Sequence, residues 1–300
     1  MTRHKKILCE DKIKIEKRYG GWTDYIIVTK GKKIYLTDYP KKKNRTSLHY
    51  FEKIVNFAGD TLKTPLSKAR VLDLACSEGI ASFAFSTVSK SVLGIEGRRV
   101  NLVKARSTKK LLGLKNVNFR KADVRNLCFP DKSFEVILAL GILYHLDVPD
   151  LFRFIENLYR WTNEIVVIDT HISFVPKVKQ TWKGKDYFGI YYDEFVPNET
   201  TQSSIGNKRS FWLTRNSLMS ILKRVGFKEI YECKLPKNYF LRQEEDRLTL
   251  VAVKRPRFAS PLFRTVDIKK FGYNESDTQV LTLQYNNYRA LEEEINSYPK

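Results

Sequence analysis

Three carboxylates in the middle of the chain each belong to a short, mostly apolar run. Asp73 lies in RVLDLA, Glu96 ends SVLGIE and Asp123 ends VNFRKAD. If these runs are successive parallel strands, the acids meet at the edge where open α/β sheets bind ligands. There the second acid can accept hydrogen bonds from both hydroxyls of a ribose, and the third suits the exocyclic amine of adenine. The acids together predict one adenosine-shaped site, although any one alone is equally well explained as a helix cap or turn residue.

A loop of small residues separates the first run from the next predicted helix, and it contains Ala75, Cys76, Ser77 and Gly79. Small residues let the backbone approach a ligand closely, and the helix that follows presents its positive N-terminus. A dinucleotide site would require the pattern G-x-G-x-x-G, whereas this loop has a single glycine. The loop therefore disfavours NAD.

Two histidines are candidates for proton transfer. His171 stands just beyond the run EIVVIDT, facing the predicted cofactor, and a positioned imidazole can remove the proton of a hydroxyl. Its alternative role is to hydrogen-bond the backbone of the following loop. His145, in the tripeptide YHL, is the second candidate, and it can equally anchor the helix that starts near Pro149.

The segment 172–212 carries aromatic residues interleaved with cations, which suits a stacked base or an anionic sugar. We interpret this segment as a lid over a substrate that accepts a transferred group. The alternative is that its aromatic residues pack a long loop onto the sheet while its lysines are solvated. The candidate acceptor contacts are Tyr144, Tyr187, Tyr191, Arg209 and Trp212.

The elements that must position these residues alternate between short apolar runs and amphipathic stretches, with helices predicted over 99–112 and 150–161. Such alternation predicts an α/β fold with a doubly wound, mostly parallel, Rossmann-like sheet. We predict a basic N-terminal cap over 1–65, with a hairpin at 25–38 and a helix at 47–59. The main domain covers 66–255, including the insertion at 172–212, and 256–300 forms a tail that ends in a helix.

Composition narrows the class of protein. The 300 residues carry a formal net charge of +21, which favours anionic partners such as nucleic acid, although a lysine-rich proteome would produce the same excess. No apolar run approaches the ~20 residues of a membrane-spanning helix, and the N-terminus lacks the pattern of a secretory signal. We therefore expect a cytoplasmic protein. Its four cysteines are scattered and predict no metal site.

The runs VLDLACSEGIAS, VLGIEGR, KADV and FEVILALGILYHL resemble the successive motifs of class I S-adenosylmethionine-dependent methyltransferases. The resemblance implies a seven-stranded sheet whose last strand is antiparallel, with S-adenosylmethionine lying across the strand tips. It places Asp73, Ala75 and Ser77 beside the methionine part, Glu96 at the ribose and Asp123 at the adenine. The remaining predicted cofactor contacts are Cys76, Gly79, Gly97, Val124, which would pack on the base, and Leu140 and Gly141, which would form the far wall.

The stretch LGILYHLDVP resembles more closely a subgroup that includes the tRNA wobble-uridine carboxymethyltransferases. The similarity covers about residues 68–172, which identifies the cofactor domain and not the acceptor. We expect unmodified S-adenosylmethionine as cofactor, and methyl transfer to oxygen or nitrogen of a polar acceptor. That acceptor is tRNA or, as the alternative, a small glycan or metabolite. A non-catalytic RNA-binding subunit with the same fold is the rival from another class.

Overall fold

The computed structural model describes residues 14–20, 22, 26–29, 32–35, 54–55, 58–194, 203–233, 246–255, 264–265 and 280–283. The predicted C-terminal helix, much of the basic N-terminal cap and residues 195–202 of the insertion lie outside these described residues. Within the N-terminal segment, β1 (Ile26–Thr29) and β2 (Lys32–Tyr35) pair as an antiparallel hairpin.

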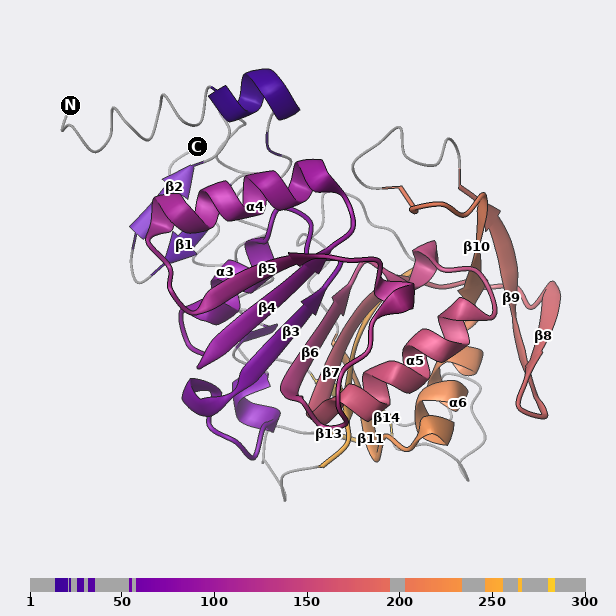
Figure 1. Ribbon diagram of the computed structural model, residues 1–300. Coiled ribbons are helices and arrows are strands. Elements are labelled where there is room, and N and C mark those ends of the chain that lie inside the picture. The colour runs from indigo at the N-terminus through magenta and orange to yellow at the C-terminus, as the bar shows by residue number, and fades with distance from the viewer. Residues whose placement is uncertain are drawn as a thin grey trace, which may run out of the picture.

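A nine-stranded sheet forms the centre of the molecule, in the order β13-β14-β11-β12-β7-β6-β3-β4-β5 (Figure 1). Strands β3 to β7 are parallel to one another, and β12 is antiparallel to both of its neighbours. The seven strands from β11 to β5 therefore confirm the predicted Rossmann-like fold, and two further strands extend one edge. The strands are β3 (Arg70–Leu74), β4 (Ser91–Glu96), β5 (Val117–Lys121), β6 (Phe134–Leu140), β7 (Thr162–His171), β11 (Glu229–Cys233), β12 (Arg247–Val253), β13 (Arg264–Thr265) and β14 (Val280–Leu283).

Helices cover both faces of this sheet (Figure 1). One face packs against α3 (Ile80–Ser86) and α4 (Arg99–Leu112), and the other against α5 (Asp150–Trp161) and α6 (Arg215–Val225). Successive side chains of a strand point to opposite faces, so the buried run of β6 serves both layers. Val136 and Leu138 join the α3/α4 layer, whereas Ile137 and Ala139 join the α5/α6 layer. This two-sided burial explains why the central strands are continuously apolar.

The helix boundaries follow local signals in the sequence. Helix α4 ends where Gly113 adopts a left-handed backbone (φ 65°), and α6 begins after Thr214, whose side chain accepts a hydrogen bond from Ser217 N. The bounds of α4 and α5 coincide with the helices predicted over 99–112 and 150–161. Because the chain leaves β3 toward β4 and returns on its other side through β6, the carboxyl ends of β3 and β6 border a crevice.

The insertion after β7 is a second sheet rather than a long loop. Strands β8 (Val178–Trp182), β9 (Lys185–Asp193) and β10 (Arg209–Leu213) are antiparallel, in the order β10-β9-β8. Lys183 and Gly184 both have positive φ (48° and 76°), which matches the two-residue turn that joins twisted hairpin strands. The sheet is fixed to α5 because Trp182 stacks on Phe152. Among the described residues, no helix is both long and apolar enough to cross a membrane.

Candidate functional site

A cavity of about 380 Å³ lies at the carboxyl ends of β3 to β6. It brings together residues from four strand tips and from the segment between β9 and β10. The predicted site residues that line it are Asp73, Ala75, Cys76, Ser77, Glu96, Gly97, Asp123, Val124, Leu140, Gly141, Tyr144 and His145.

The loop after β3 is held in an unusual backbone conformation. Ala75 and Ser77 have φ values of 55° and 51°, in the left-handed region that glycine adopts without steric cost. The loop is tied to the next strand, because Cys76 N donates to Ile95 O (2.9 Å) and Ser77 N to Glu96 Oε2 (2.9 Å). These bonds hold two non-glycine residues in a conformation that costs about 1–2 kcal/mol each.

Substituting Ala75 with glycine is therefore expected to raise the free energy of unfolding by about 0.5–1 kcal/mol, because relief of the left-handed strain exceeds the added entropy of the unfolded chain. Urea denaturation measures the change. Ala81→Gly, inside helix α3, is the matched control and should lower the same quantity by at least about 0.5–1 kcal/mol. Destabilisation by Ala75→Gly would show that the loop is unstrained.

Glu96 lies at the tip of β4 with its carboxylate buried beside the cavity. Its Oε1 accepts from Arg98 N (2.6 Å), while Oε2 accepts from Ser77 N. Burial raises the pKa of Glu96, and these backbone hydrogen bonds oppose that effect. Each carboxylate oxygen has a second lone pair, so the group can accept further hydrogen bonds from a ligand in the cavity.

Asp73 is buried at the end of β3, where Ser82 Oγ donates to Oδ2 (2.6 Å). The pKa of Asp73 is raised to about 7, mainly because burial disfavours the charged form; the hydrogen bonds from Ser82 partly oppose this shift, and the charge of Glu96 adds to it. Near neutral pH this carboxyl therefore exchanges between its neutral and ionised forms. A cationic group in the cavity would favour the ionised form.

This shift gives a pH-dependent prediction for stability. Between about pH 4 and pH 7 the folded chain retains a proton on Asp73 that the unfolded chain has released, so the contribution of this group to stability falls as pH rises. The difference in unfolding free energy between the wild type and Asp73→Asn should therefore decrease up to about pH 7 and be flat above it. Urea denaturation at several pH values checks this; Asp131→Asn, at an exposed site, is the control, and parallel curves for wild type and Asp73→Asn would contradict the prediction.

Asp123 lies just after β5 and is shared between the cavity and Arg125. Its Oδ1 accepts from Arg125 N (2.9 Å), and its Oδ2 lies 2.5 Å from Arg125 Nη2. Burial acts to raise the pKa of Asp123, but the hydrogen bonds and charge of Arg125 outweigh it, and the net shift is downward. The carboxylate is thus ionised at neutral pH and keeps acceptor capacity for an amine.

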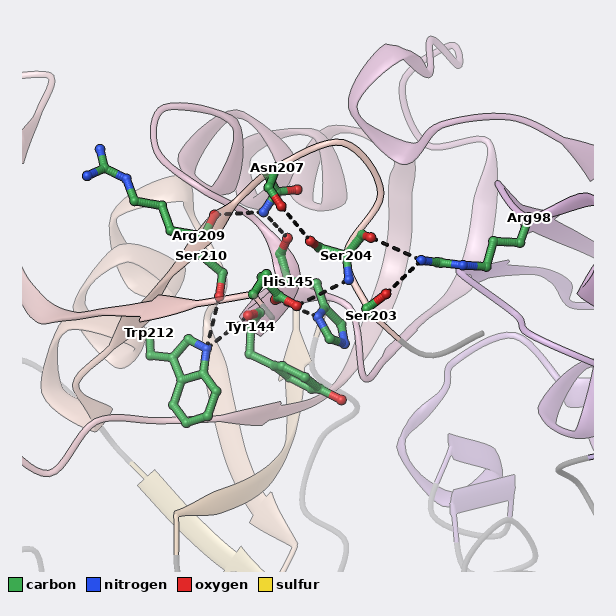
Figure 2. Close-up of polar contacts among 10 residues, drawn as sticks. Arg98, Tyr144, His145, Ser203, Ser204, Asn207, Arg209, Ser210 and Trp212 are labelled. Atoms are coloured by element: carbon green, nitrogen blue, oxygen red, sulfur yellow. Dashed lines mark hydrogen bonds and ion pairs between the residues drawn. The ribbon is translucent and has the colours of Figure 1, made fainter. Parts of the chain in front are cut away.

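The far wall of the cavity follows β6, and its polar groups come from Tyr144 and His145. Gly141 has φ 82°, and a Cβ there would lie 3.6 Å from the Tyr144 hydroxyl. Trp212 Nε1 donates to the Tyr144 carbonyl (2.9 Å), which fixes this turn to β10 (Figure 2). His145 Nδ1 lies 2.8 Å from Oε1 of Glu194, a buried carboxylate directly after β9.

His171, the first candidate base, lies behind the wall instead of on it. Its ring stacks on Trp212 (5.0 Å between centroids) and meets Tyr144 edge-on (4.6 Å), and its Nδ1 is 3.2 Å from Asp246 Oδ1. It is absent from the lining of the main cavity. Trp212, Tyr144 and Asp246 surround the His171 ring, whereas Arg247, its paired residue on β12, lines the cavity.

The predicted acceptor contacts on the insertion also lie away from the cavity. Tyr187 is fully buried against Phe152, so its role is in the core. Arg209 stacks on Tyr191 (3.9 Å) and pairs with Asp147. Neither these side chains nor Trp212 lines the cavity.

Gly79 does not line the cavity either. A Cβ at Gly79 would lie 2.9 Å from the ring of Phe119, so this glycine allows the start of α3 to pack closely on β5.

Several cavity residues carried no signal in the sequence. Arg98, Asn101 and Arg125 belong to the α4 and β5 sides, Arg247 to β12, and Ser203, Ser204, Ile205 and Asn207 to the segment before β10. The sequence also did not identify Glu194 as the partner of His145. The sequence pattern that could have identified part of this set is a basic residue two positions after Glu96 and Asp123, at Arg98 and Arg125.

The arrangement suits a nucleoside attached to a cationic amino acid. Carboxylates from three successive strand tips, buried at Asp73 and Glu96 and half-buried at Asp123, meet a loop of small residues. The cavity volume falls within the usual range of small-molecule sites. Among the described residues, no cluster of His, Cys, Asp and Glu side chains has the geometry of a metal site.

Comparisons with known proteins agree with this geometry. A sequence model described as a methyltransferase domain matches residues 71–164. An uncharacterised methyltransferase of Bacillus subtilis is 23% identical over 184 residues, covering 60% of this chain and 67% of the relative. A ubiquinone biosynthesis O-methyltransferase of Azorhizobium caulinodans is 28% identical over 151 residues, or 47% of this chain and 58% of the relative.

Among solved structures, the N-terminal domain of EvdMO1, crystallised in the presence of SAH and D-fucose, shares the fold with a TM-score of 0.57. It is 24% identical and covers 86% of this chain and 98% of its own. The strand order, the acids at three strand tips and the matched methyltransferase domain agree. Residues 71–164 therefore form a methyltransferase domain, and the enzyme is an S-adenosylmethionine-dependent methyltransferase.

Proposed function

We propose that this enzyme methylates a hydroxyl oxygen of a small polar acceptor, with His145 as the general base. The observation that carries the proposal is the His145–Glu194 pair at the cavity wall. An imidazole held by a carboxylate is a common proton acceptor in enzymes, because the carboxylate fixes the ring and stabilises the positive charge that forms.

The cofactor residues are assigned by the same proposal. Asp73 and the loop at Ala75 and Ser77 hold the amino-acid end of S-adenosylmethionine, Glu96 accepts the ribose hydroxyls, and Asp123 accepts the adenine amine. The burial of Asp73 and Glu96, and the distribution of the three acids over three strand tips that border one cavity, support this order.

The proposed reaction requires the cofactor, the acceptor and one proton-accepting side chain of the enzyme. When bound, the cofactor supplies a methyl group from its sulfonium. In the transfer the acceptor oxygen would take the methyl carbon from sulfur and leave S-adenosylhomocysteine, and Nε2 of His145 would receive the hydroxyl proton. Gly141 and Tyr144 line the same cavity and would help to hold the acceptor hydroxyl toward the methyl donor.

The shape of the site supports a small acceptor. The segment from Ser203 to Asn207 lines the cavity and is bonded by Arg98, after β4, and Arg125, after β5. The site is therefore compact. Two similar proteins are consistent with such an acceptor. The EvdMO1 domain was crystallised in the presence of D-fucose, and the Azorhizobium sequence relative is named an O-methyltransferase. We therefore place a sugar or another small polyol first among acceptor classes.

A tRNA acceptor is the second candidate, and the net charge of +21 favours it. None of the three relatives described above is named as acting on RNA. Much of the basic N-terminal segment lies outside the described residues, so the charge alone supports this candidate.

Transfer of an isotope-labelled methyl group tests the two candidates. The purified enzyme is supplied with labelled S-adenosylmethionine and either total tRNA or a sugar-rich small-molecule extract, and mass spectrometry locates the label. We expect an O-methyl product in the small-molecule fraction. Label in tRNA, with an affinity that falls steeply as salt rises, would overturn the small-acceptor proposal.

A further inference from the structure

We propose that Glu194 is a positioning residue that orients His145 and, through the same carboxylate, links the base to the segment that encloses the cofactor. This inference rests on the proposed function of His145. We name the segment from Ser203 to Asn207 the cover segment.

The Glu194 carboxylate has three hydrogen-bond partners, which are His145, the backbone N–H of Ser204 and the side chain of Ser210. Oε1 lies 2.8 Å from His145 Nδ1, and Oε2 accepts from Ser204 N (3.2 Å). The side chain is almost completely buried. Burial acts to raise the pKa of Glu194, but the hydrogen bond and charge of His145 and the bond from Ser204 N outweigh it, so the net shift is downward. The group is therefore ionised at neutral pH and acts only as an acceptor.

An acceptor at Nδ1 determines the tautomer of His145. Because the carboxylate cannot donate, Nδ1 carries the proton of the neutral ring, and the lone pair is on Nε2. Since His145 lines the cavity, Nε2 is the nitrogen assigned to receive the proton of the acceptor hydroxyl. Without Glu194 the ring can adopt either tautomer, and only one of them serves the reaction.

The cover segment is bonded on both of its sides. On the cofactor side, Arg98 Nη2 donates to Ser203 Oγ (3.1 Å) and to Ser204 O (3.0 Å). On the base side, Asn207 Nδ2 donates to the carbonyl of His145 (3.0 Å). Figure 2 shows Ser203 and Ser204 between Arg98 and His145. Glu194 thus belongs to a network that joins the ribose end of the site to the base.

The Arg125 side chain adds a second link between the cover segment and the cofactor site. Its Nη2 donates to Ile205 O (2.9 Å) while its guanidinium pairs with Asp123. The residues that the proposal places at the ribose and the adenine, Glu96 and Asp123, are therefore each followed by an arginine that holds the cover segment. Enclosing the adenosine and orienting the base require the same closed arrangement.

Glu194→Gln separates these roles because an amide has only one oxygen. It can accept from His145 Nδ1 or from Ser204 N, but it cannot accept from both without turning a donor toward one of them. We expect kcat to fall about 10–100-fold, as for other residues that orient a histidine through its second nitrogen, and the affinity for S-adenosylmethionine to fall several-fold. Asp193→Asn removes one charge at the exposed neighbouring position and is the matched control, with kcat unchanged.

A double-mutant cycle distinguishes positioning from other effects. In a His145→Ala background, Glu194→Gln should cause no further loss of kcat but should still weaken cofactor binding, measured by calorimetry. An equal loss of kcat in both backgrounds would overturn the positioning role while leaving the base assignment intact. Unchanged turnover in His145→Ala alone would instead overturn the proposed function. If Glu194→Gln does not fold by circular dichroism, Glu194→Asp enters the same cycle with the same expected pattern.

Discussion

His145→Ala is expected to lower kcat about 10²–10⁴-fold while leaving the affinity for S-adenosylmethionine nearly unchanged. The loss is that of a positioned general base, and His145 is not among the groups assigned to the cofactor. Initial rates with saturating acceptor, together with cofactor calorimetry, measure the two quantities separately.

His171→Ala is the control for that substitution, because both histidines contact Tyr144 but His145 alone lines the main cavity. We expect His171→Ala to lower stability, through the lost contacts with Trp212 and Tyr144, more than it lowers turnover. A larger loss of kcat in His171→Ala than in His145→Ala would indicate that His171, at the end of β7, is the general base.

Glu96→Ala should weaken binding of S-adenosylmethionine by at least about 10²-fold. Each charge-assisted hydrogen bond to a ribose hydroxyl contributes about 1.5–3 kcal/mol, and the substitution removes two. It also leaves the N–H groups of Ser77 and Arg98 without the acceptor that now holds the loop and the strand tip. Calorimetry with the cofactor gives the change in Kd.

Glu135→Gln is the matched control for Glu96→Ala. Glu135 is also a buried carboxylate, but it pairs with Arg70 at the opposite end of the parallel strands, away from the cavity. This variant should change thermal stability and leave cofactor affinity unaltered. Equal affinity of Glu96→Ala and wild type for the cofactor would show that the ribose does not bind at β4.

The sheet and its acids could be predicted because their signals are local. Buried parallel strands appear as continuous apolar runs. Glu96 ends such a run, Asp123 stands just beyond one, and Asp73 is one residue before the end of its strand. Parallel strands then bring Asp73, Glu96 and Asp123 together whatever the helices between them contain. The same logic identified the small-residue loop, in which Ala75 and Ser77 adopt the left-handed conformation that glycine more commonly supplies.

The acceptor side could not be predicted in the same way because it depends on contacts between distant segments. His145 and Glu194 are 49 residues apart and meet only because the insertion folds back beside α5. The choice between His145 and His171 likewise depends on which residue after β6 or β7 turns toward the cavity, and periodicity carries no information on this.

The strands of the insertion did have a signal, which the density of aromatic and basic residues obscured. The sequence TWKGKDYF places Lys-Gly between two β-prone stretches, as TKGKKIY does at the predicted N-terminal hairpin. In the insertion this turn joins β8 to β9. Its aromatic residues at Tyr187 and Trp182 therefore pack against α5 and do not form an acceptor platform.

The two strands added beyond the seven-stranded sheet cover the edge that β11 would otherwise expose. Strand β14 pairs in parallel with β11, and β13 pairs in turn with β14. Without them the backbone N–H and C=O groups along one side of β11 would be unpaired, and an open strand of that kind can pair with another copy of the chain. Strands β13 and β14 therefore matter for keeping the enzyme monodisperse in solution, although they lie at the sheet edge farthest from β3 and β4.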